Sequence, residues 1–252
     1  MEHYLGTVVL FILVWSSFLQ LSESAEYRFK GSKYSRIDAS ANRVNAAEGH
    51  QVYPDNYGDH LPHLFVYWTR DAYVSTGCYN LDTKCQPGFV NFANSGWRVG
   101  DALAPSEING NQTELSITVF WDAGNKYWVL KVNGEHIGYW PASLFTLLNE
   151  EVATRVNFGG EITNRETDGR HTKTDMGSGE FAEAGYKKAA YIRAMQTVNL
   201  QNELVAAPLE PNNGPFSSNS SCYDAQKFSD PSSEWGTYLF YGGEGLSSSC
   251  PI

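Results

Sequence analysis

Hydrophobic residues in the middle of the chain recur with the two-residue period of β-strands. In residues 115–121, Leu115, Ile117, Val119 and Trp121 occupy every second position. Successive side chains of a strand point to opposite faces, so this spacing is typical of a strand with one buried face. The pattern therefore predicts a half-buried strand over these residues.

Tight turns join this segment to two further strands. Residues 122–125 read Asp-Ala-Gly-Asn, a turn sequence, and residues 126–132 return as a second strand. Asn133-Gly134 follows, which is the strongest short signal for a β-hairpin, and residues 135–140 form a third strand. Three strands joined in this way predict an antiparallel β-meander.

The rest of the pattern also favours β-structure. Strand-like runs occupy residues 64–69, 155–162, 190–198 and 235–241, whereas residues 26–60 are polar and rich in turn residues. Short strands without strand–helix–strand alternation predict an all-β fold, of the β-sandwich type.

One short helix is predicted within this β-sequence. It begins at Pro141 and runs to about Ala153, because four apolar residues recur at helical spacing. These residues are Leu144, Phe145, Leu148 and Val152.

The first 24 residues differ from the rest of the chain. Residues 5–21 are apolar and uncharged, and Ser22-Glu23-Ser24 then places small residues where a signal peptidase requires them. We expect residues 1–24 to be a secretory signal peptide and the protein to be extracellular. A single membrane anchor is the alternative. No second long apolar run follows, so we expect no membrane association after cleavage.

The amino-acid composition argues against a disordered chain and against one class of binding partner. The chain has 7 Trp, 15 Tyr and 13 Phe but only 18% charged residues, which argues against disorder. Its net charge of −10 argues against nucleic acid as a partner, because phosphate binding needs clustered Lys and Arg. The oligomeric state is not predicted.

Four cysteines follow the predicted signal peptide, and an even number in an oxidising compartment suggests two disulfides. Three pairings are possible. We favour Cys78–Cys85 and Cys222–Cys250, because each closes a local loop. Their spacing does not fit a metal site, and no metal or cofactor is predicted.

Two sequons lie in loop-like sequence. They begin at Asn111 and Asn219, so these residues are candidate glycosylation sites.

The sequence offers few nucleophile or metal motifs. Gly177-Ser178-Gly179 lacks the spacing of a serine-hydrolase elbow. Pro62 lies between the two histidines of the segment 60–63, which argues against a zinc site. Glu161 stands out instead, because it follows two glycines in an apolar run. It is either an outward-facing strand residue or an active-site carboxylate.

Several sequence blocks resemble the neprosin family of plant secreted proteins. The resemblance covers residues 46–252 in order. Its blocks are 57–59 (Tyr-Gly-Asp), 64–69, 76–80, 87–90, 138–145, 158–161 (Phe-Gly-Gly-Glu), 174–179, 188–191 and 241–243.

The resemblance implies a fold and a chemistry. The family's characterised member is a glutamic endopeptidase that cleaves after proline. It is a β-sandwich of two curved antiparallel sheets with the disulfide pairing favoured above, and it uses two glutamates without a metal or cofactor. Two close carboxyls do not both ionise easily, so one can activate water while the other protonates the leaving nitrogen. The Gly-Gly-Glu glutamate of the family corresponds to Glu161.

The second family glutamate lies two residues before a Gly-Trp pair. Counted back from Gly49, that position is Ala47, and Glu48 comes one residue later. A shift of one residue turns a strand side chain to the opposite face, and a β-bulge would return Glu48 to the site. Glu161 and Glu48 are therefore the candidate catalytic pair.

The resemblance also divides the chain. We expect a signal peptide (1–24), a short divergent N-terminal segment (25–45) and a neprosin-like domain (46–252). The function hypothesis is a secreted glutamic endopeptidase acting on proline-containing peptides. The alternative is a secreted, catalytically inactive domain that binds peptide or cell-wall components.

Overall fold

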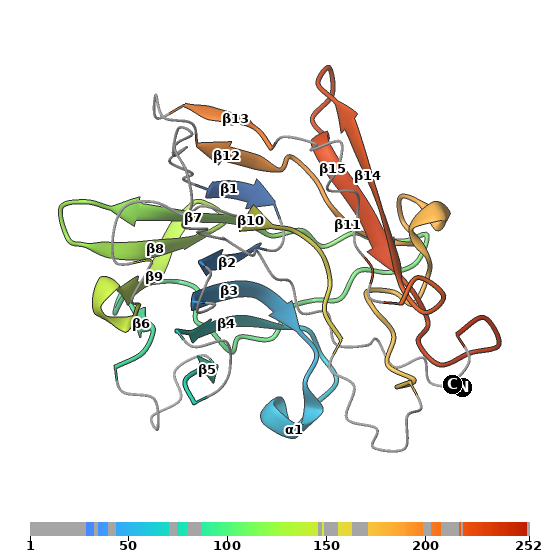
Figure 1. Ribbon diagram of the computed structural model, residues 1–252, viewed down its shortest axis with the longest axis horizontal. Coiled ribbons are helices and arrows are strands. Elements are labelled where there is room, and N and C mark those ends of the chain that lie inside the picture. The colour runs from blue at the N-terminus through green and yellow to red at the C-terminus, as the bar shows by residue number, and fades with distance from the viewer. Residues whose placement is uncertain are drawn as a thin grey trace, which may run out of the picture.

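A computed structural model describes most of the chain after the predicted signal peptide (Figure 1). The described residues are 29–32, 35–39, 44–70, 75–79, 87–145, 148, 156–162, 171–198, 203–207, 217 and 219–250. Within these ranges, side chains are described from residue 52 onward, except that of Val198. The predicted signal peptide lies outside the described residues.

The described strands form three antiparallel sheets. The seven-stranded sheet has, in order, β13 (Leu204–Ala206), β12 (Gln196–Val198), β1 (Phe29–Ser32), β7 (Ser116–Asp122), β8 (Tyr127–Val132), β9 (Glu135–Pro141) and β6 (Val90–Asn91). The five-stranded sheet has β10 (Val156–Asn157), β2 (Ser35–Ala39), β3 (Val44–Gln51), β4 (His63–Thr69) and β5 (Cys78–Tyr79). The three-stranded sheet has β11 (Ala190–Ile192), β15 (Gly236–Gly242) and β14 (Asp224–Asp230).

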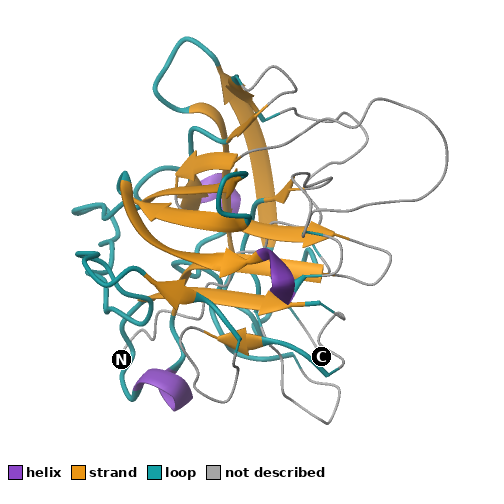
Figure 2. Ribbon diagram, turned by 90° about the vertical axis from the view of Figure 1, so that its left-hand side faces the viewer, coloured by secondary structure: helices purple, strands orange, loops and turns teal. Residues whose placement is uncertain are grey.

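In the described part of the chain, helical structure is limited to short segments, as Figure 2 shows. These segments are α1 (Pro54–Tyr57) and the 3-10 turns η1 (Ala142–Leu144) and η2 (Ala182–Ala184). The predicted all-β fold is confirmed. Among the described residues, no helix has the length and apolar character needed to cross a membrane.

The main hydrophobic core lies between the seven-stranded and five-stranded sheets. The predicted meander β7–β8–β9 contributes Ile117, Leu130 and Trp140, which are fully buried. From the five-stranded sheet, β4 contributes Leu64 and Val66 to the same core. Two antiparallel sheets thus bury their inner faces against each other, which is the predicted sandwich.

The hairpin between β8 and β9 follows its sequence signal closely. Asn133 has φ 50° and Gly134 has φ 83°, which is the left-handed backbone that a two-residue hairpin turn requires. The Asn133 side chain also accepts a hydrogen bond from the backbone N–H of Ser116 (2.9 Å). This turn therefore fixes the register of the meander.

The predicted helix over residues 141–153 is wrong. Pro141 ends β9, a single 3-10 turn follows in η1, and Phe145 has extended backbone angles (φ −112°, ψ 148°). Leu144, Phe145 and Leu148 are all buried in the main core. At residues 144 and 145 the apolar spacing reflects burial in the core without a helix, so periodicity alone gave a misleading signal. Residues 146, 147 and 149–153 lie outside the described residues.

Strands were missed at both ends of the chain. β1, β2 and β3 begin between residues 29 and 44, where turn-like sequence was expected. β14 was also missed, and the predicted strand over residues 190–198 is two strands, β11 and β12, in different sheets. These differences add a third sheet to the predicted two.

Candidate functional site

The segment that carries Glu161 leaves β10 and passes over a second hydrophobic cluster. Phe158 and Ile162 pack against this cluster, which contains Met176 and Tyr241. A side chain on Gly160 would meet it too, because an added Cβ would lie 2.7 Å from Met176 Sδ and 2.8 Å from Tyr241 Cε2. The even-numbered positions of this segment therefore face inward.

The odd-numbered positions face the other way. A Cβ added to Gly159 would meet nothing within 4 Å, and Glu161 is half-buried. Asn157, two residues before Gly159, is also half-buried and pairs with Arg36 of β2. The alternation therefore predicts that Glu161 lies on the same side of the segment as Gly159.

The strand register continues this odd-numbered face across the five-stranded sheet. Asn157 lies opposite Arg36, Arg36 opposite Ala47, Ala47 opposite Tyr67, and Tyr67 opposite Tyr79. Directly opposed residues share a face of the sheet. Tyr67 forms a small cluster with Phe65 and Tyr79 that is separate from the main core. We call this side of the five-stranded sheet, which faces away from the main core, the Tyr67 face; Phe65 and Tyr67 are buried there and Tyr79 is half-buried.

Glu48 occupies the neighbouring register position. It lies opposite Ser35 of β2 and Val66 of β4, and Val66 belongs to the main core. Pairing between β3 and β4 runs from Asn45 to Gln51 without interruption. The side chain of Glu48 lies outside the described ones, so the Glu48–Glu161 pair stays a prediction.

His63, the first residue of β4, connects the five-stranded sheet to the loop that contains Gly100. His63 is buried; its Nδ1 is 2.8 Å from the carbonyl of Gly100, and its Nε2 is 2.9 Å from Asp59 Oδ1. Tyr57 stacks on the imidazole at 4.0 Å. The hydrogen bond with His63 holds the pKa of Asp59 below its ordinary value, and the Leu61 N–H adds to this effect. Both ring nitrogens of His63 are therefore engaged in protein contacts.

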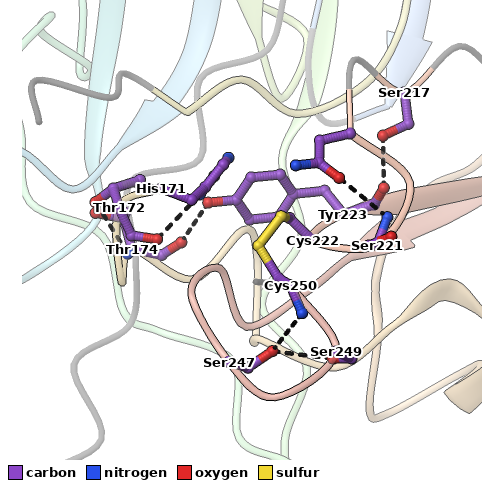
Figure 3. Close-up of a disulfide and its surroundings, with 11 residues drawn as sticks. His171, Thr172, Thr174, Ser217, Ser221, Cys222, Tyr223, Ser247, Ser249 and Cys250 are labelled. Carbon is purple, nitrogen blue, oxygen red and sulfur yellow. Dashed lines mark hydrogen bonds between the residues drawn. A yellow bond between two sulfur atoms is a disulfide. The ribbon is translucent and has the colours of Figure 1, made fainter. Parts of the chain in front are cut away.

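The second predicted disulfide is present and anchors the C-terminal region. Cys222 is bonded to Cys250, and both are fully buried (Figure 3). His171 lies beside them, with its ring 5.2 Å from that of Tyr223. Although one His171 nitrogen and both sulfurs lie within 4.8 Å of one another, the sulfurs are in the disulfide and are not thiolate ligands for a metal. Cys78 is also disulfide-bonded, and Cys85, its predicted partner, lies outside the described residues.

The two candidate glycosylation sites differ in exposure. Asn111 is exposed, whereas Asn219 is half-buried and its side-chain oxygen accepts a hydrogen bond from the Ser221 N–H (3.2 Å). Attachment of glycans at either residue stays a prediction.

A cavity of about 110 Å³ adjoins the Tyr241 side of the Glu161 segment. Val52, Leu103 and Ala189 contribute apolar walls, and Tyr241 lines it as well. The Tyr241 ring also faces Gly160, so a single buried side chain separates this cavity from the backbone next to Glu161.

Comparison with known protein families identifies the family of this chain. A family model described as Neprosin matches residues 26–244. The chain belongs to the neprosin family. The match begins 20 residues before residue 46, where the resemblance starts, and it includes β1 and β2.

Within this neprosin-family chain, sequence reasoning singled out Glu161 as a candidate but did not predict the side chains that hold its segment. Met176 and Tyr241 fix the inward side of the segment, and they lie 15 and 80 residues further along the chain. The glycine pair was the available signal, because a glycine is required where a side chain would collide with a packed neighbour. The sequence around Met176 and Tyr241 gave no indication that these two side chains pack against Gly160.

Proposed function

We propose that this neprosin-family protein binds extended, proline-containing peptides on the Tyr67 face, with Glu161 as the family glutamate it retains there. On this proposal the domain does not hydrolyse peptides by the paired-glutamate route. This proposal rests on the register between β3 and β4, in which Ala47 lies opposite Tyr67 and Glu48 lies opposite Val66.

Regular pairing supports this assignment. Neighbouring strand positions alternate between the two faces of a sheet, and only an extra residue in one strand changes this order. The pairings of β3 with β2 and with β4 run without a shift, whereas a shift is present between Leu130 and Lys131 in the β8–β9 pair. Ala47 is also the position that corresponds to the second family glutamate.

Aromatic side chains support a peptide as the ligand. Phe65, Tyr67 and Tyr79 pack together on this face, and Tyr53 meets Tyr79 edge to face at 6.3 Å. Tyr53 and Tyr79 are half-buried, so each keeps part of its surface available. Aromatic surfaces bind proline-rich segments well, because these segments are already extended and lose little conformational entropy on binding.

The second candidate function is glutamic endopeptidase activity. Family membership and the half-buried Glu161, which follows the Gly-Gly pair, favour it. It requires that Glu48 approach Glu161, so that one carboxylate takes a proton from water and the other carboxyl donates a proton to the leaving nitrogen.

One experiment separates the two functions. The mature chain is incubated with a proline-rich peptide at about pH 3–5, where carboxyl pairs titrate. It is compared with Glu161→Gln, Glu48→Gln and the exchange variant Ala47→Glu/Glu48→Ala, which restores the family order. Peptide binding is followed by fluorescence anisotropy and cleavage by mass spectrometry.

The proposal predicts binding without cleavage by the unaltered chain, and new cleavage by the exchange variant that disappears when Glu161→Gln is added. Cleavage by the unaltered chain that either single glutamine substitution abolishes would establish the endopeptidase instead. Absence of peptide binding by a chain whose circular dichroism shows a folded β-protein would refute the binding proposal.

We also propose that the protein is secreted and glycosylated. A disulfide supports an oxidising compartment, and the exposed Asn111 is accessible to modification. N-terminal sequencing of the exported protein should begin at residue 25. Glycosidase treatment should lower its mass, and Asn111→Gln should remove part of that change. An intracellular protein that retains residues 1–24 would contradict the proposal.

A further inference from the structure

The outer face of the three-stranded sheet carries a row of aromatic side chains. Along β15, Thr237, Leu239 and Tyr241 are buried, whereas the alternating Tyr238 and Phe240 are half-buried. Phe228 of β14 lies opposite Tyr238 in the register and is 38% exposed. Figure 1 shows β14 and β15 as a long hairpin beside the two larger sheets. The rings thus lie on the side of this sheet that faces away from its hydrophobic cluster.

These rings form one continuous surface with two side chains from neighbouring turns. The ring centroids of Phe228 and Tyr238 are 5.2 Å apart, those of Tyr238 and Trp235 are 5.1 Å apart, and those of Trp235 and Tyr186 are 5.3 Å apart. Phe240 lies 5.7 Å from Trp235. We call these five residues the aromatic strip. Its ends are its most exposed parts, because Tyr186 is 50% exposed.

Hydrogen-bonding groups border the rings. The hydroxyls of Tyr186 and Tyr238, the indole N–H of Trp235 and the side-chain amide of the exposed Gln226 have no hydrogen-bond partner among the described residues. Gln226 lies opposite Phe240 in the β14–β15 pair. The strip therefore offers flat apolar surface and polar groups at the same place.

The cation that contacts the strip is already paired with carboxylates. Arg193 lies 5.9 Å from the centre of the Trp235 ring, and its guanidinium is 2.7 Å from Glu114 and 3.7 Å from Glu234. Because these two carboxylates occupy the guanidinium, Arg193 does not favour an anionic ligand on the rings. A matching ligand is neutral, and it has to combine apolar surface with many hydroxyl groups.

We propose that the aromatic strip binds a neutral glycan chain. A pyranose ring has an apolar face of C–H groups, which packs on the electron-rich face of an aromatic ring, and hydroxyls at its rim, which pair with the bordering polar groups. A lipid tail would leave these polar groups without partners, and that is unfavourable. The strip is separate from the Tyr67 face, so the glycan site does not depend on the proposed peptide-binding function.

Binding of cellohexaose and mannohexaose, two neutral oligosaccharides, tests this proposal. Isothermal titration calorimetry is performed with the mature chain and with Trp235→Ala, Tyr238→Ala and Gln226→Ala. Tyr139→Ala is the matched control, because Tyr139 stacks on Tyr127 at 4.2 Å on the outer side of the seven-stranded sheet, away from the strip. Circular dichroism verifies that each variant is folded.

We expect at least one oligosaccharide to bind, and loss of either ring to weaken binding about two- to tenfold, as for other aromatic contacts. Gln226→Ala should weaken it less, and Tyr139→Ala and Glu161→Gln should leave it unchanged. Failure of both oligosaccharides to bind the folded chain would overturn the proposal. So would binding that only Tyr139→Ala reduces, or binding confined to anionic polygalacturonate or to lipid vesicles.

Discussion

Replacing Gly160 by alanine tests how the Glu161 segment is held. The added methyl group would lie 2.7 Å from Met176 Sδ and 2.8 Å from Tyr241 Cε2, both closer than ordinary van der Waals contact. Met176 can rotate, but the Tyr241 ring is 1% exposed and cannot move without displacing its own neighbours. Overpacking of this kind costs about 1–3 kcal/mol. For a chain of this size, each kcal/mol lowers the melting temperature by about 2–4 °C.

Gly159→Ala is the matched control, because its methyl group would meet nothing within 4 Å. That substitution should be neutral or should stabilise the protein by about 0.4–1 kcal/mol, since it restricts only the unfolded chain. The free energy of unfolding is measured by urea titration at neutral pH for both variants. Equal losses for the two glycines would refute the steric argument. Strictly additive costs of Gly160→Ala and Met176→Ala would do so as well, because removing a clashing neighbour should make the pair less than additive.

Two further predictions concern the edges of the fold. Asp59→Asn should lower the melting temperature near neutral pH. The hydrogen bond with His63 lowers the folded-state pKa of Asp59, so its contribution is present above the ordinary value of 3.8 and is lost as the pH falls through the lowered pKa. Thermal unfolding across pH checks this, and a difference between the two proteins that grows on acidification would contradict it. Replacing both Cys222 and Cys250 by serine should reduce the free energy of unfolding by about 3–4 kcal/mol, because the disulfide closes a loop of 28 residues. An unchanged urea midpoint in non-reducing buffer would argue against this contribution.

The parts of the fold that sequence predicted are those whose contacts are local. The β7–β8–β9 meander depends on alternation within each strand and on a turn, Asn133-Gly134, whose residues tolerate the required backbone angles. No distant residue is needed to specify these hairpins. The same reasoning failed over residues 190–198, because the chain leaves one sheet after Ile192 and enters another at Gln196 without a break in its strand-like composition.

The missed N-terminal strands have a different cause. Over residues 29–51, the sequence is mostly polar, and yet β1 and β2 each pair with strands on both sides. Such strands are specified by the backbone hydrogen bonds of their neighbours more than by a hydrophobic pattern of their own. The register that separates Ala47 from Glu48 is set in this region, so sequence alone left the position of the second acid open.

The position of Glu161 depends more on packing than on strand pairing. β10 has only two residues, Val156 and Asn157, and the sheet contact ends four residues before the glutamate. Beyond that point the segment is held from its inward side, where Phe158, Ile162 and the Gly160 backbone meet the cluster beneath the three-stranded sheet. A carboxylate placed this way keeps its orientation only while that cluster is intact. A substitution inside the cluster should therefore shift Glu161 without altering the packing of Phe65, Tyr67 and Tyr79, and the same contact explains why Gly160 directly precedes the acid.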